Sequence, residues 1–461
     1  MSNLDQTLVN TFKGIVGNEN TLTDASECWP YGYDNSRQHA PPDVVLFPTS
    51  HQQISDIVTA CYQRGIPLVA RGRGTGTTGA AVPVKGGVVL SLEHMDKIID
   101  IDPDNRSMDV QPGVTNAEVQ RAAARHGFFW PPDPTSGDVC TVGGNLACNA
   151  AGPRAIKYGT SRDNVLGLHA VTGTGDSIRT GVYTTKGVVG YDLTRLLIGA
   201  EGTLAVITRA TLKLTPMAEI VRTLRAVYQD IHSAARAVAA IMSQPITPCA
   251  LEIMDGKCIE LANQYKDLGL PEHAGALLMI EVDGAADAID GAVERVKTAA
   301  GNDGLLEIEA ADSDAARKQL WQARKALSPA LRHVAPKKIN EDVVVPVSRI
   351  PELIDGLQSL AEEHGISIVN FGHAGNGNIH VNLLIDPDDP QQMAQTQPCL
   401  DKLFQLVLDL NGTLSGEHGI GMEKRQYVSR EIDETTMKLM RNIKQQFDPA
   451  GILNPGKLFP D

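Results

Sequence analysis

Three histidines and a glutamate near the C-terminal end lie in glycine-flanked motifs whose residue types can hold a metal and move a proton. The segment His373-Ala374-Gly375-Asn376-Gly377-Asn378-Ile379-His380 has a histidine at each end of a Gly/Asn-rich turn, with strand-like sequence on both sides. A tight hairpin brings its ends together, so we expect these imidazoles to face one another. Glu417 and His418 follow between two glycines. Two histidines and one carboxylate suit zinc or another divalent metal and leave positions for water or substrate.

A single histidine is more often a hydrogen-bonded core or surface residue than a metal ligand. Three of the chain's 12 histidines occur in these motifs beside a glutamate, which favours the metal site. A carboxylate substrate would also need a cation. Arg324 lies on a predicted helix one turn from Ser328, and the arginine fork binds carboxylates through two hydrogen bonds. The alternative for Arg324, as for the downstream Lys338, is a solvated surface charge.

A glycine-rich loop follows a predicted strand over residues 66–70. Its sequence, Gly74-Thr75-Gly76-Thr77-Thr78-Gly79, matches the GxGxxG pattern of Rossmann folds, which requires a helix to begin at the loop. Pro83 and the pair Gly86-Gly87 break any helix there, and residues 88–92 predict a strand. The loop therefore predicts a phosphate cradle of backbone N–H groups and threonine hydroxyls. The alternative is a surface turn without a ligand.

The remaining pattern predicts an α+β fold. Ser50 and Thr115 begin capping boxes before amphipathic helices. Two further glycine-rich connections, residues 141–159 and 199–203, are long enough to be binding loops. Beyond residue 219, strand-like and helical runs alternate. They predict an antiparallel or mixed sheet with helices over one face, as in ferredoxin-like folds.

Composition excludes several classes of protein. The 461 residues include 41 Lys+Arg and 55 Asp+Glu, for a net charge of −14, which argues against nucleic-acid binding. The chain shows neither a secretory signal nor an apolar run of membrane-spanning length, so we expect a soluble protein, at most peripheral to a membrane. Seven scattered cysteines without a CxxC pair predict reduced thiols and a cytoplasmic location.

These motifs together resemble a known family. Residues 67–79, Pro67-Leu68-Val69-Ala70-Arg71-Gly72-Arg73-Gly74-Thr75-Gly76-Thr77-Thr78-Gly79, resemble the pyrophosphate loop of the vanillyl-alcohol-oxidase type of FAD-binding flavoproteins. The family's later flavin-contacting loops resemble residues 132–136, 141–145, 149–152, 157–159, 199–204 and 454–457 of this chain. The order and spacing agree over essentially the whole chain. Within the family, the resemblance is strongest to D-lactate, D-2-hydroxyglutarate and glycolate dehydrogenases.

The resemblance implies three parts: a two-subdomain FAD-binding domain of the p-cresol-methylhydroxylase type over residues 1–215, a ferredoxin-like substrate domain carrying the metal site over 216–425, and a helical segment over 426–461 that returns to the FAD domain. Because the pyrophosphate loop has Arg73 and no histidine, we expect non-covalent FAD. The implied cofactor-binding residues are Arg71, Gly72, Arg73, Gly74, Thr75, Gly76, Thr77, Thr78, Gly79, Pro134, Thr135, Thr141, Gly143, Gly144, Asn145, Asn149, Gly152, Gly159, Glu201, Gly202 and Asn454.

The resemblance also implies roles for the polar residues of the substrate domain. His373, His380 and Glu417 fall on the family's metal ligands, for zinc or alternatively manganese, and His418 falls on its catalytic base. The positions that match substrate-binding residues are Arg324, Ser328, Lys338 and Asn382. In the implied reaction His418 takes the hydroxyl proton while the Cα hydrogen leaves as hydride to FAD.

The implied activity is oxidation of a D-2-hydroxy acid to the 2-oxo acid. D-lactate is favoured, with D-2-hydroxyglutarate or glycolate as the alternative. The electron acceptor would be a quinone, an electron-transferring flavoprotein or a cytochrome. The sequence leaves open whether the chain forms a homodimer. Three other readings are disfavoured: non-redox ether-lipid synthesis, which would not be expected to carry Arg324 with the Gly-Glu-His-Gly motif; a nicotinamide-dependent Rossmann dehydrogenase; and a binding protein whose loops have lost their function.

Overall fold

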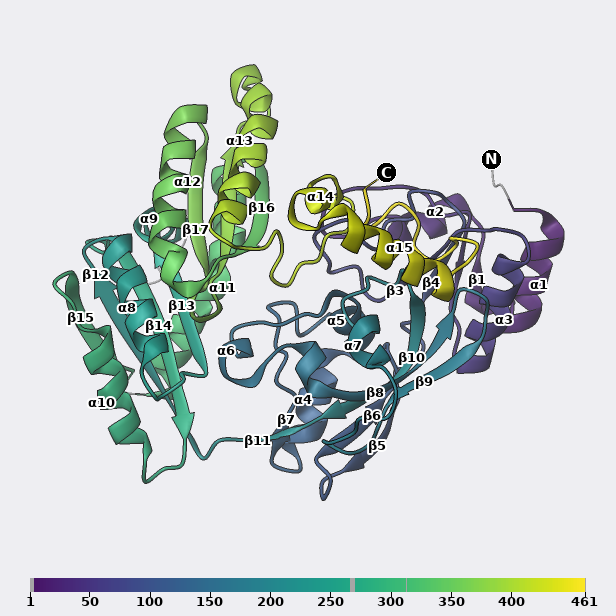
Figure 1. Cartoon of the computed structure of the whole chain (residues 1–461), viewed down its shortest axis with the longest axis horizontal. Coiled ribbons are helices and arrows are strands. Elements are labelled where there is room, and N and C mark those ends of the chain that lie inside the picture. The colour runs from purple at the N-terminus through teal and green to yellow at the C-terminus, as the bar shows by residue number, and fades with distance from the viewer. Residues whose placement is uncertain (1–3, 266–269, 312, 461) are drawn as a thin grey trace. The chain divides into compact units, whose positions relative to one another are not determined.

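Helices and strands are mixed throughout the computed structural model, as the α+β pattern predicts, and the model describes residues 4–265, 270–311 and 313–460 (Figure 1). The chain forms two units. Unit 1 comprises Met1–Gly152, Gly159–Met217 and Glu417–Asp461, and unit 2 comprises Pro153–Tyr158 and Ala218–Gly416. Residues 417–425, which we expected with the substrate domain, thus belong to unit 1. No helix within the described ranges is both long and apolar enough to cross a membrane.

The first sheet of unit 1 carries the glycine-rich loop. Its strands lie in the order β1 (Thr21–Leu22), β2 (Val44–Leu46), β4 (Val88–Ser91) and β3 (Leu68–Arg71). Both β2 and β3 pair in parallel with β4. Helices α1 (Gln6–Val16) and α3 (His51–Tyr62) share its core, and Ser50 caps α3 as predicted. The loop joins β3 to β4 without a helix, so the rejection of the Rossmann form is confirmed.

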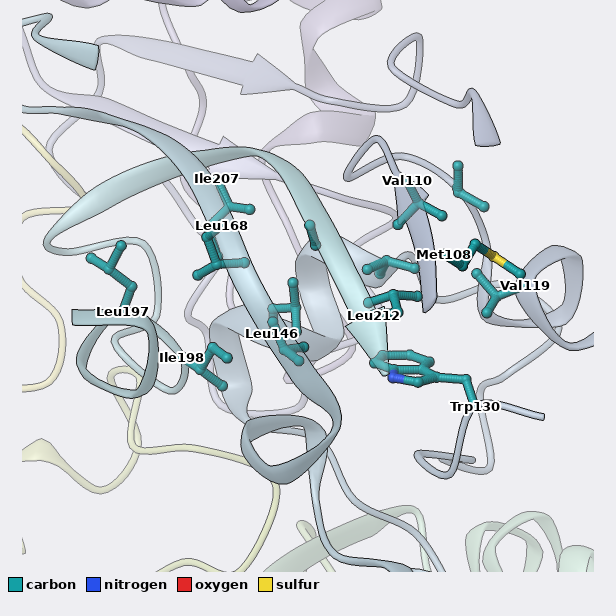
Figure 2. Packing of buried hydrophobic residues seen from close by; sticks show 14 of the residues in the cluster. Met108, Val110, Val119, Trp130, Leu146, Leu168, Leu197, Ile198, Ile207 and Leu212 are labelled. Atoms are coloured by element: carbon teal, nitrogen blue, oxygen red, sulfur yellow. The ribbon is translucent and has the colours of Figure 1, made fainter. Parts of the chain in front are cut away.

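The second sheet of unit 1 is antiparallel. Its strands lie in the order β5 (Ile98–Asp102), β6 (Ser107–Val110), β10 (Ala205–Lys213), β8 (Val165–Thr172) and β9 (Ser177–Gly181). Helix α4 (Asn116–Ala124) has the predicted capping box at Thr115. Figure 2 shows the core beside this sheet, where Trp130 packs with Leu146 and Leu212. The Trp130 indole N–H donates to the Asn164 carbonyl, so its polar atom is satisfied inside the core.

One glycine-rich connection is more ordered than the sequence suggested. Residues 141–159 contain α5 (Val142–Cys148) and α6 (Ala155–Tyr158) instead of an uninterrupted loop. Thr141 caps the start of α5, and Asn149 ends it with a left-handed backbone at φ 53°. These two residues define a short helix that the glycines at its start concealed.

The C-terminal segment is built into the first sheet of unit 1. After α14 (Val428–Glu431) and α15 (Glu434–Phe447), the Ile452 carbonyl accepts from the Leu68 N–H, and the Asn454 N–H donates to the Leu68 carbonyl. The Asp448 carboxylate accepts the N–H groups of Ile452 and Leu453. The return of this segment to the FAD domain is therefore confirmed.

Unit 2 is built on one antiparallel sheet. Its strands lie in the order β15 (Leu305–Ala310), β12 (Ile220–Tyr228), β14 (Ala276–Gly284), β13 (Ala250–Asp255), β17 (Ser367–His373), β18 (Asn378–Ile385) and β16 (Lys337–Val344). Each neighbouring pair runs antiparallel.

Helices cover both faces of this sheet, so the expectation of helices over one face is wrong (Figure 1). Helices α9 (Gly256–Tyr265) and α11 (Asp314–Val334) share a core with Val227, whereas the next residue, Tyr228, donates its hydroxyl to Ala300 of α10 (Ile289–Ala300). The helices on the α10 side are α8 (Ile231–Ser243), α12 (Ile350–His364) and α13 (Pro390–Asp409) (Figure 1). The elements of unit 2 that the sequence pattern did not predict are α9 and β16. Residues 276–282 of β14 are all buried, as in a sheet covered on both faces.

The shorter elements complete the chain. They are α2 (Ala25–Cys28), β7 (Phe128–Phe129), α7 (Leu193–Leu197), β11 (Thr215–Pro216), and the 3-10 turns η1 (Asn18–Asn20), η2 (Trp29–Tyr31), η3 (Ser161–Asn164), η4 (Val347–Arg349), η5 (Ala374–Asn376) and η6 (Arg425–Tyr427). All seven cysteines lie in described parts of the chain and are free thiols, as expected.

Asp255, at the end of β13, is expected to make the stability of unit 2 depend on pH. Its carboxylate accepts N–H bonds from Cys258 at 2.7 Å and Asn370 at 2.6 Å, and burial raises its pKa from 3.8 to about 6. Between these values the folded state binds more protons than the unfolded state. We therefore expect this group's contribution to the free energy of unfolding to fall as the pH rises from about 4 to about 6. The free energy of unfolding, measured with urea, should show this fall with pH in the wild type and not in Asp255→Asn. Identical pH profiles for the two proteins would contradict the prediction.

Candidate functional site

The residues expected to bind FAD all belong to unit 1. In the glycine-rich loop, Gly74 and Gly79 have φ values of +66° and +77°, which favour glycine. A Cβ atom on Gly72 would collide with the Thr141 hydroxyl, and one on Gly74 with the Arg71 guanidinium. The loop therefore packs closely against the segment that begins α5, another segment expected to contact the cofactor.

Three buried polar atoms in these segments fit a polar cofactor. Thr77 Oγ1, Asn145 Nδ2 and Asn454 Oδ1 are buried and have no hydrogen-bond partner among the described residues. Leaving such an atom unsatisfied costs about 1–3 kcal/mol, so buried polar atoms are normally paired. Each of the three comes from a different segment expected to contact FAD. A bound cofactor with hydroxyl, carbonyl and phosphate groups would supply the missing partners.

Two predicted cofactor residues make bonds within the protein. Arg71 donates to the carbonyls of Tyr33 at 2.7 Å and Pro30 at 3.4 Å, which ties the N-terminal segment to β3. Asn454 Nδ2 donates to the carbonyls of Ala80 at 2.9 Å and Glu201 at 2.7 Å. Asn454 thus lies beside the end of the glycine-rich loop, while its amide oxygen makes neither of these bonds.

The segment that carries Glu417 and His418 is fixed to the FAD loops of unit 1. The Glu201 carboxylate accepts the N–H groups of Ile420 at 2.6 Å and Gly421 at 2.8 Å. Burial raises the pKa of Glu201, although both N–H bonds oppose this. Thr78 accepts the Met422 N–H through its carbonyl and donates its hydroxyl to the His418 carbonyl at 3.3 Å. These bonds explain why residues 417–425 belong to unit 1.

Glu417 itself is oriented by a backbone donor. The Gly152 N–H donates to Glu417 Oε2 at 2.8 Å. Gly152 has φ +101°, and a Cβ atom there would lie 2.6 Å from the Asp133 carbonyl oxygen, so the position requires glycine. A predicted metal ligand is therefore held by one of the predicted FAD-contacting segments.

In unit 2 the two hairpin histidines converge. Strands β17 and β18 are joined by η5 and Gly377, which has φ +73°. His373 pairs in register with Asn378, and His380 with Phe371, so the histidines are diagonal and not directly opposite neighbours. Their ring centroids are 5.3 Å apart at 82°, and the residues are only 5% and 6% exposed. Two buried imidazoles this close suit a shared divalent metal.

Asp342, on β16, pairs in register with His380. Its side chain is fully buried and accepts from Asn378 Nδ2 at 2.6 Å, from the Ser415 hydroxyl at 3.0 Å and from the Gly416 N–H at 2.9 Å. The last residue of unit 2 is therefore anchored to the strand beside His380. Glu417 follows it directly in the chain.

Glu252, on β13, joins two predicted site residues. Its side chain is fully buried; one carboxylate oxygen lies 2.6 Å from His373 Nδ1, and the other accepts from Arg324 Nε at 2.8 Å. Burial opposes its ionisation, but His373 and Arg324 hold the pKa of this carboxyl below its usual value. The Arg324 guanidinium also lies 4.6 Å from the ring centroid of Phe371. Arg324, with its side chain 11% exposed, is thus a largely covered cation with a fixed orientation and not a solvated surface charge.

Two other predicted substrate residues, Lys338 and Asn382, are placed on the same sheet as Glu252. In β16 and β18, Lys338 pairs in register with Leu384 and Asn340 with Asn382, and strand alternation puts both pairs on the face of His380. Asn382 Nδ2 donates to the carbonyls of Val369 and His380, while its Oδ1 is buried with no partner in the described chain. The side chain of Ser328 lies outside the described residues.

Sequence reasoning missed Glu252 and Asp342. Glu252 lies inside a largely apolar strand, Ala250–Asp255, whereas Asp342 lies in the more polar strand Lys337–Val344, where it is fully buried. A carboxylate in a buried strand needs a specific partner, and that was the available signal. The partners themselves, His373 and Asn378, lie far away in the sequence.

Comparisons with known proteins find relatives over nearly the whole chain. A family model for the FAD binding domain matches residues 42–181, and one for the C-terminal domain of FAD linked oxidases matches residues 217–458. The chain is 38% identical to glycolate oxidase subunit GlcD of Bacillus subtilis (strain 168), over 93% of this chain and 92% of the relative. It is 36% identical to a D-lactate dehydrogenase of Archaeoglobus fulgidus, over 90% and 91%.

Solved structures show the same fold. A p-cresol methylhydroxylase structure has a TM-score of 0.82 at 18% identity, covering 100% of this chain and 98% of that chain. An alkyldihydroxyacetonephosphate synthase structure has a TM-score of 0.75 at 18% identity, covering 98% and 86%. These matches confirm the architecture that the sequence motifs predicted.

Proposed function

The chain belongs to the FAD-linked oxidases, and from this premise we propose that it oxidises a D-2-hydroxy acid to the 2-oxo acid with non-covalently bound FAD. D-lactate is the favoured substrate, supported by relatives named D-lactate dehydrogenase. D-2-hydroxyglutarate and glycolate are the alternatives, the latter supported by relatives named glycolate oxidase subunit. A quinone, an electron-transferring flavoprotein or a cytochrome would reoxidise the flavin.

FAD would be held by the glycine-rich loop and the segments around Asn145, Gly152 and Asn454. When bound, it supplies the acceptor for the hydride that leaves Cα. Thr77, Asn145 and Asn454 offer buried polar atoms that this ligand would satisfy.

A divalent metal, zinc or alternatively manganese, would be held by His373, His380 and Glu417. The donor set fits such an ion: two imidazoles and one carboxylate, with a carboxylate outer partner on His373. Glu417 is supported as the third ligand because the residue before it is bonded to Asp342, which pairs with His380. A bound metal supplies Lewis acidity toward the substrate hydroxyl.

The chain's own residues would then orient the substrate and move the proton. Arg324 and Lys338 bind the carboxylate, with Asn382 contributing through its amide oxygen and Ser328 through its hydroxyl. His418 would take the hydroxyl proton, and FAD, when bound, would supply the acceptor for the Cα hydride. Fixing the carboxylate decides which face of Cα meets the flavin and thus the stereochemistry.

The observation that carries the proposal is the bridging of His373 and Arg324 by Glu252. One buried carboxylate brings together a candidate metal ligand on β17 and a candidate carboxylate-binding cation on α11. A metal with a carboxylate-binding arginine beside it is the arrangement that a 2-hydroxy acid, with its hydroxyl next to its carboxylate, would require.

The test is an anaerobic titration of the yellow protein. We expect D-lactate to bleach the flavin band, L-lactate not to bleach it, and D-2-hydroxyglutarate and glycolate to act more weakly. Prior chelation should abolish bleaching, and added zinc or manganese should restore it. Bleaching by NADH alone, or by none of these acids, would overturn the proposal.

A further inference from the structure

We propose that Glu252 is a positioning residue that links metal binding to substrate-carboxylate binding, by holding His373 in its metal-binding tautomer and Arg324 in its carboxylate-binding orientation. This inference rests on the proposed function. It assigns a role to a residue that touches neither metal nor substrate.

The carboxylate has one oxygen for each partner. One oxygen contacts His373 Nδ1 at 2.6 Å, and the other accepts from Arg324 Nε at 2.8 Å. The side chain of Glu252 is fully buried, and that of Arg324 is 11% exposed. Neither contact competes with bulk water, so both are stronger than the same pairs on the surface.

The contact with His373 decides which ring nitrogen is available. An ionised carboxylate can only accept, so His373 must carry its proton on Nδ1. The lone pair is then on Nε2, which becomes the ligating atom. A carboxylate behind a ligating histidine also fixes the ring and raises its basicity.

The contact with Arg324 uses Nε and leaves the two terminal nitrogens of the fork for a second carboxylate. Phe371 supports the guanidinium from one face, at 4.6 Å from its ring centroid. The same Phe371 ring lies 5.5 Å from that of His380. Glu252, His373, His380, Phe371 and Arg324 therefore form a closed ring of contacts, and a change at Glu252 reaches both functions.

Replacing Glu252 by glutamine leaves one acceptor where two are needed. If Arg324 takes the amide oxygen, His373 faces an NH₂ donor and shifts to the tautomer protonated on Nε2, which cannot ligate through that atom. If His373 takes the oxygen, Arg324 loses its acceptor and its fixed orientation. Since His373 and Arg324 cannot both be satisfied, the affinity for the metal, the affinity for the substrate carboxylate, or both must fall.

The experiment uses the FAD-loaded protein and measures two dissociation constants. The first is for zinc, from competition with a chromophoric chelator in the absence of substrate. The second is for D-lactate, from the concentration dependence of flavin reduction in zinc-saturated protein. In Glu252→Gln we expect at least one constant to rise by about 10- to 100-fold, the range found when an outer partner of a metal ligand is lost. Glu252→Asp, whose shorter side chain cannot reach both partners, should shift the constants in the same direction.

The matched control is Glu281→Gln. Glu281 is a buried glutamate on the adjacent strand β14, where it accepts from the Thr223 hydroxyl at 2.8 Å and the Trp321 indole N–H at 2.7 Å. Trp321 lies on α11, one turn before Arg324, so this variant perturbs the same helix. It should lower thermal stability and leave both dissociation constants within about twofold of wild type.

The outcomes separate the two proposals. Folded Glu252 variants with both constants unchanged, or changed no more than in Glu281→Gln, overturn the inference alone. The same holds if both Glu252 variants fail to fold while Glu281→Gln folds, because Glu252 would then be a core residue only. A wild-type protein that binds no zinc and is bleached by none of the hydroxy acids overturns the proposed function, and the inference with it.

Discussion

Replacing His418 by glutamine is expected to slow flavin reduction by D-lactate by about 10²- to 10⁴-fold, the usual contribution of a positioned general base. FAD should remain bound, because the segment around His418 is held through backbone groups. Glu201 accepts the N–H groups of Ile420 and Gly421, and Thr78 bonds to the His418 carbonyl. None of these bonds involves the imidazole. The variant should therefore keep its fold and lose only proton transfer.

Anaerobic stopped-flow mixing with D-lactate measures this rate, and the flavin absorbance of the purified protein measures FAD occupancy. His126→Gln is the control, since His126 is an exposed residue just after α4 in the same unit. It should reduce at the wild-type rate. A His418→Gln protein that is also reduced at that rate would remove His418 from the mechanism.

Local chemistry explains which parts of the fold were predictable. The capping residues Ser50 and Thr115 act on the N–H groups three residues away, so the sequence alone predicts where α3 and α4 begin. Pro83 likewise excludes a helix after the glycine-rich loop whatever the tertiary structure, and the structure has none there.

The features that sequence reasoning missed depend on partners distant in the chain. Helix α9 begins at Gly256 and is capped by Asp255, whose carboxylate accepts the Cys258 N–H at 2.7 Å. Its core partners include Ala323 and Phe371, which are distant in the chain, and the second covered face of the unit 2 sheet was not foreseen. Residues 417–425, expected with the substrate domain, group with unit 1, because their position depends on the Glu201 carboxylate, more than 200 residues away.

The candidate site also has one part that the sequence predicted and another part that it did not. The hairpin motif predicted that His373 and His380 would approach one another, because a turn of this composition joins neighbouring strands. Arg324 was predicted as a carboxylate-binding cation, but its buried bond to Glu252 was not. That bond requires the packing of α11 against the unit 2 sheet, which no local pattern specifies.

Replacing Glu417 by glutamine is expected to weaken metal binding and flavin reduction together, in contrast to His418→Gln, which should affect reduction alone. The amide oxygen can still accept the Gly152 N–H that now bonds to Glu417 Oε2 at 2.8 Å, so the segment should keep its position. What is lost is the negative charge offered to the metal. Losing Lewis-acid assistance of several kcal/mol corresponds to a fall of about 10³-fold in the rate of reduction.

Metal content after dialysis, zinc competition and anaerobic stopped-flow reduction together check this expectation. Glu423→Gln is the matched control, because Glu423 lies six residues further along the same segment and accepts from Gln38 Nε2 at 3.1 Å. It should retain metal and react at the wild-type rate. If Glu417→Gln keeps its zinc but loses activity, Glu417 acts on the substrate and not on the metal. If it keeps both, the third ligand lies elsewhere, and the pair His373 and His380 must be completed by another oxygen donor.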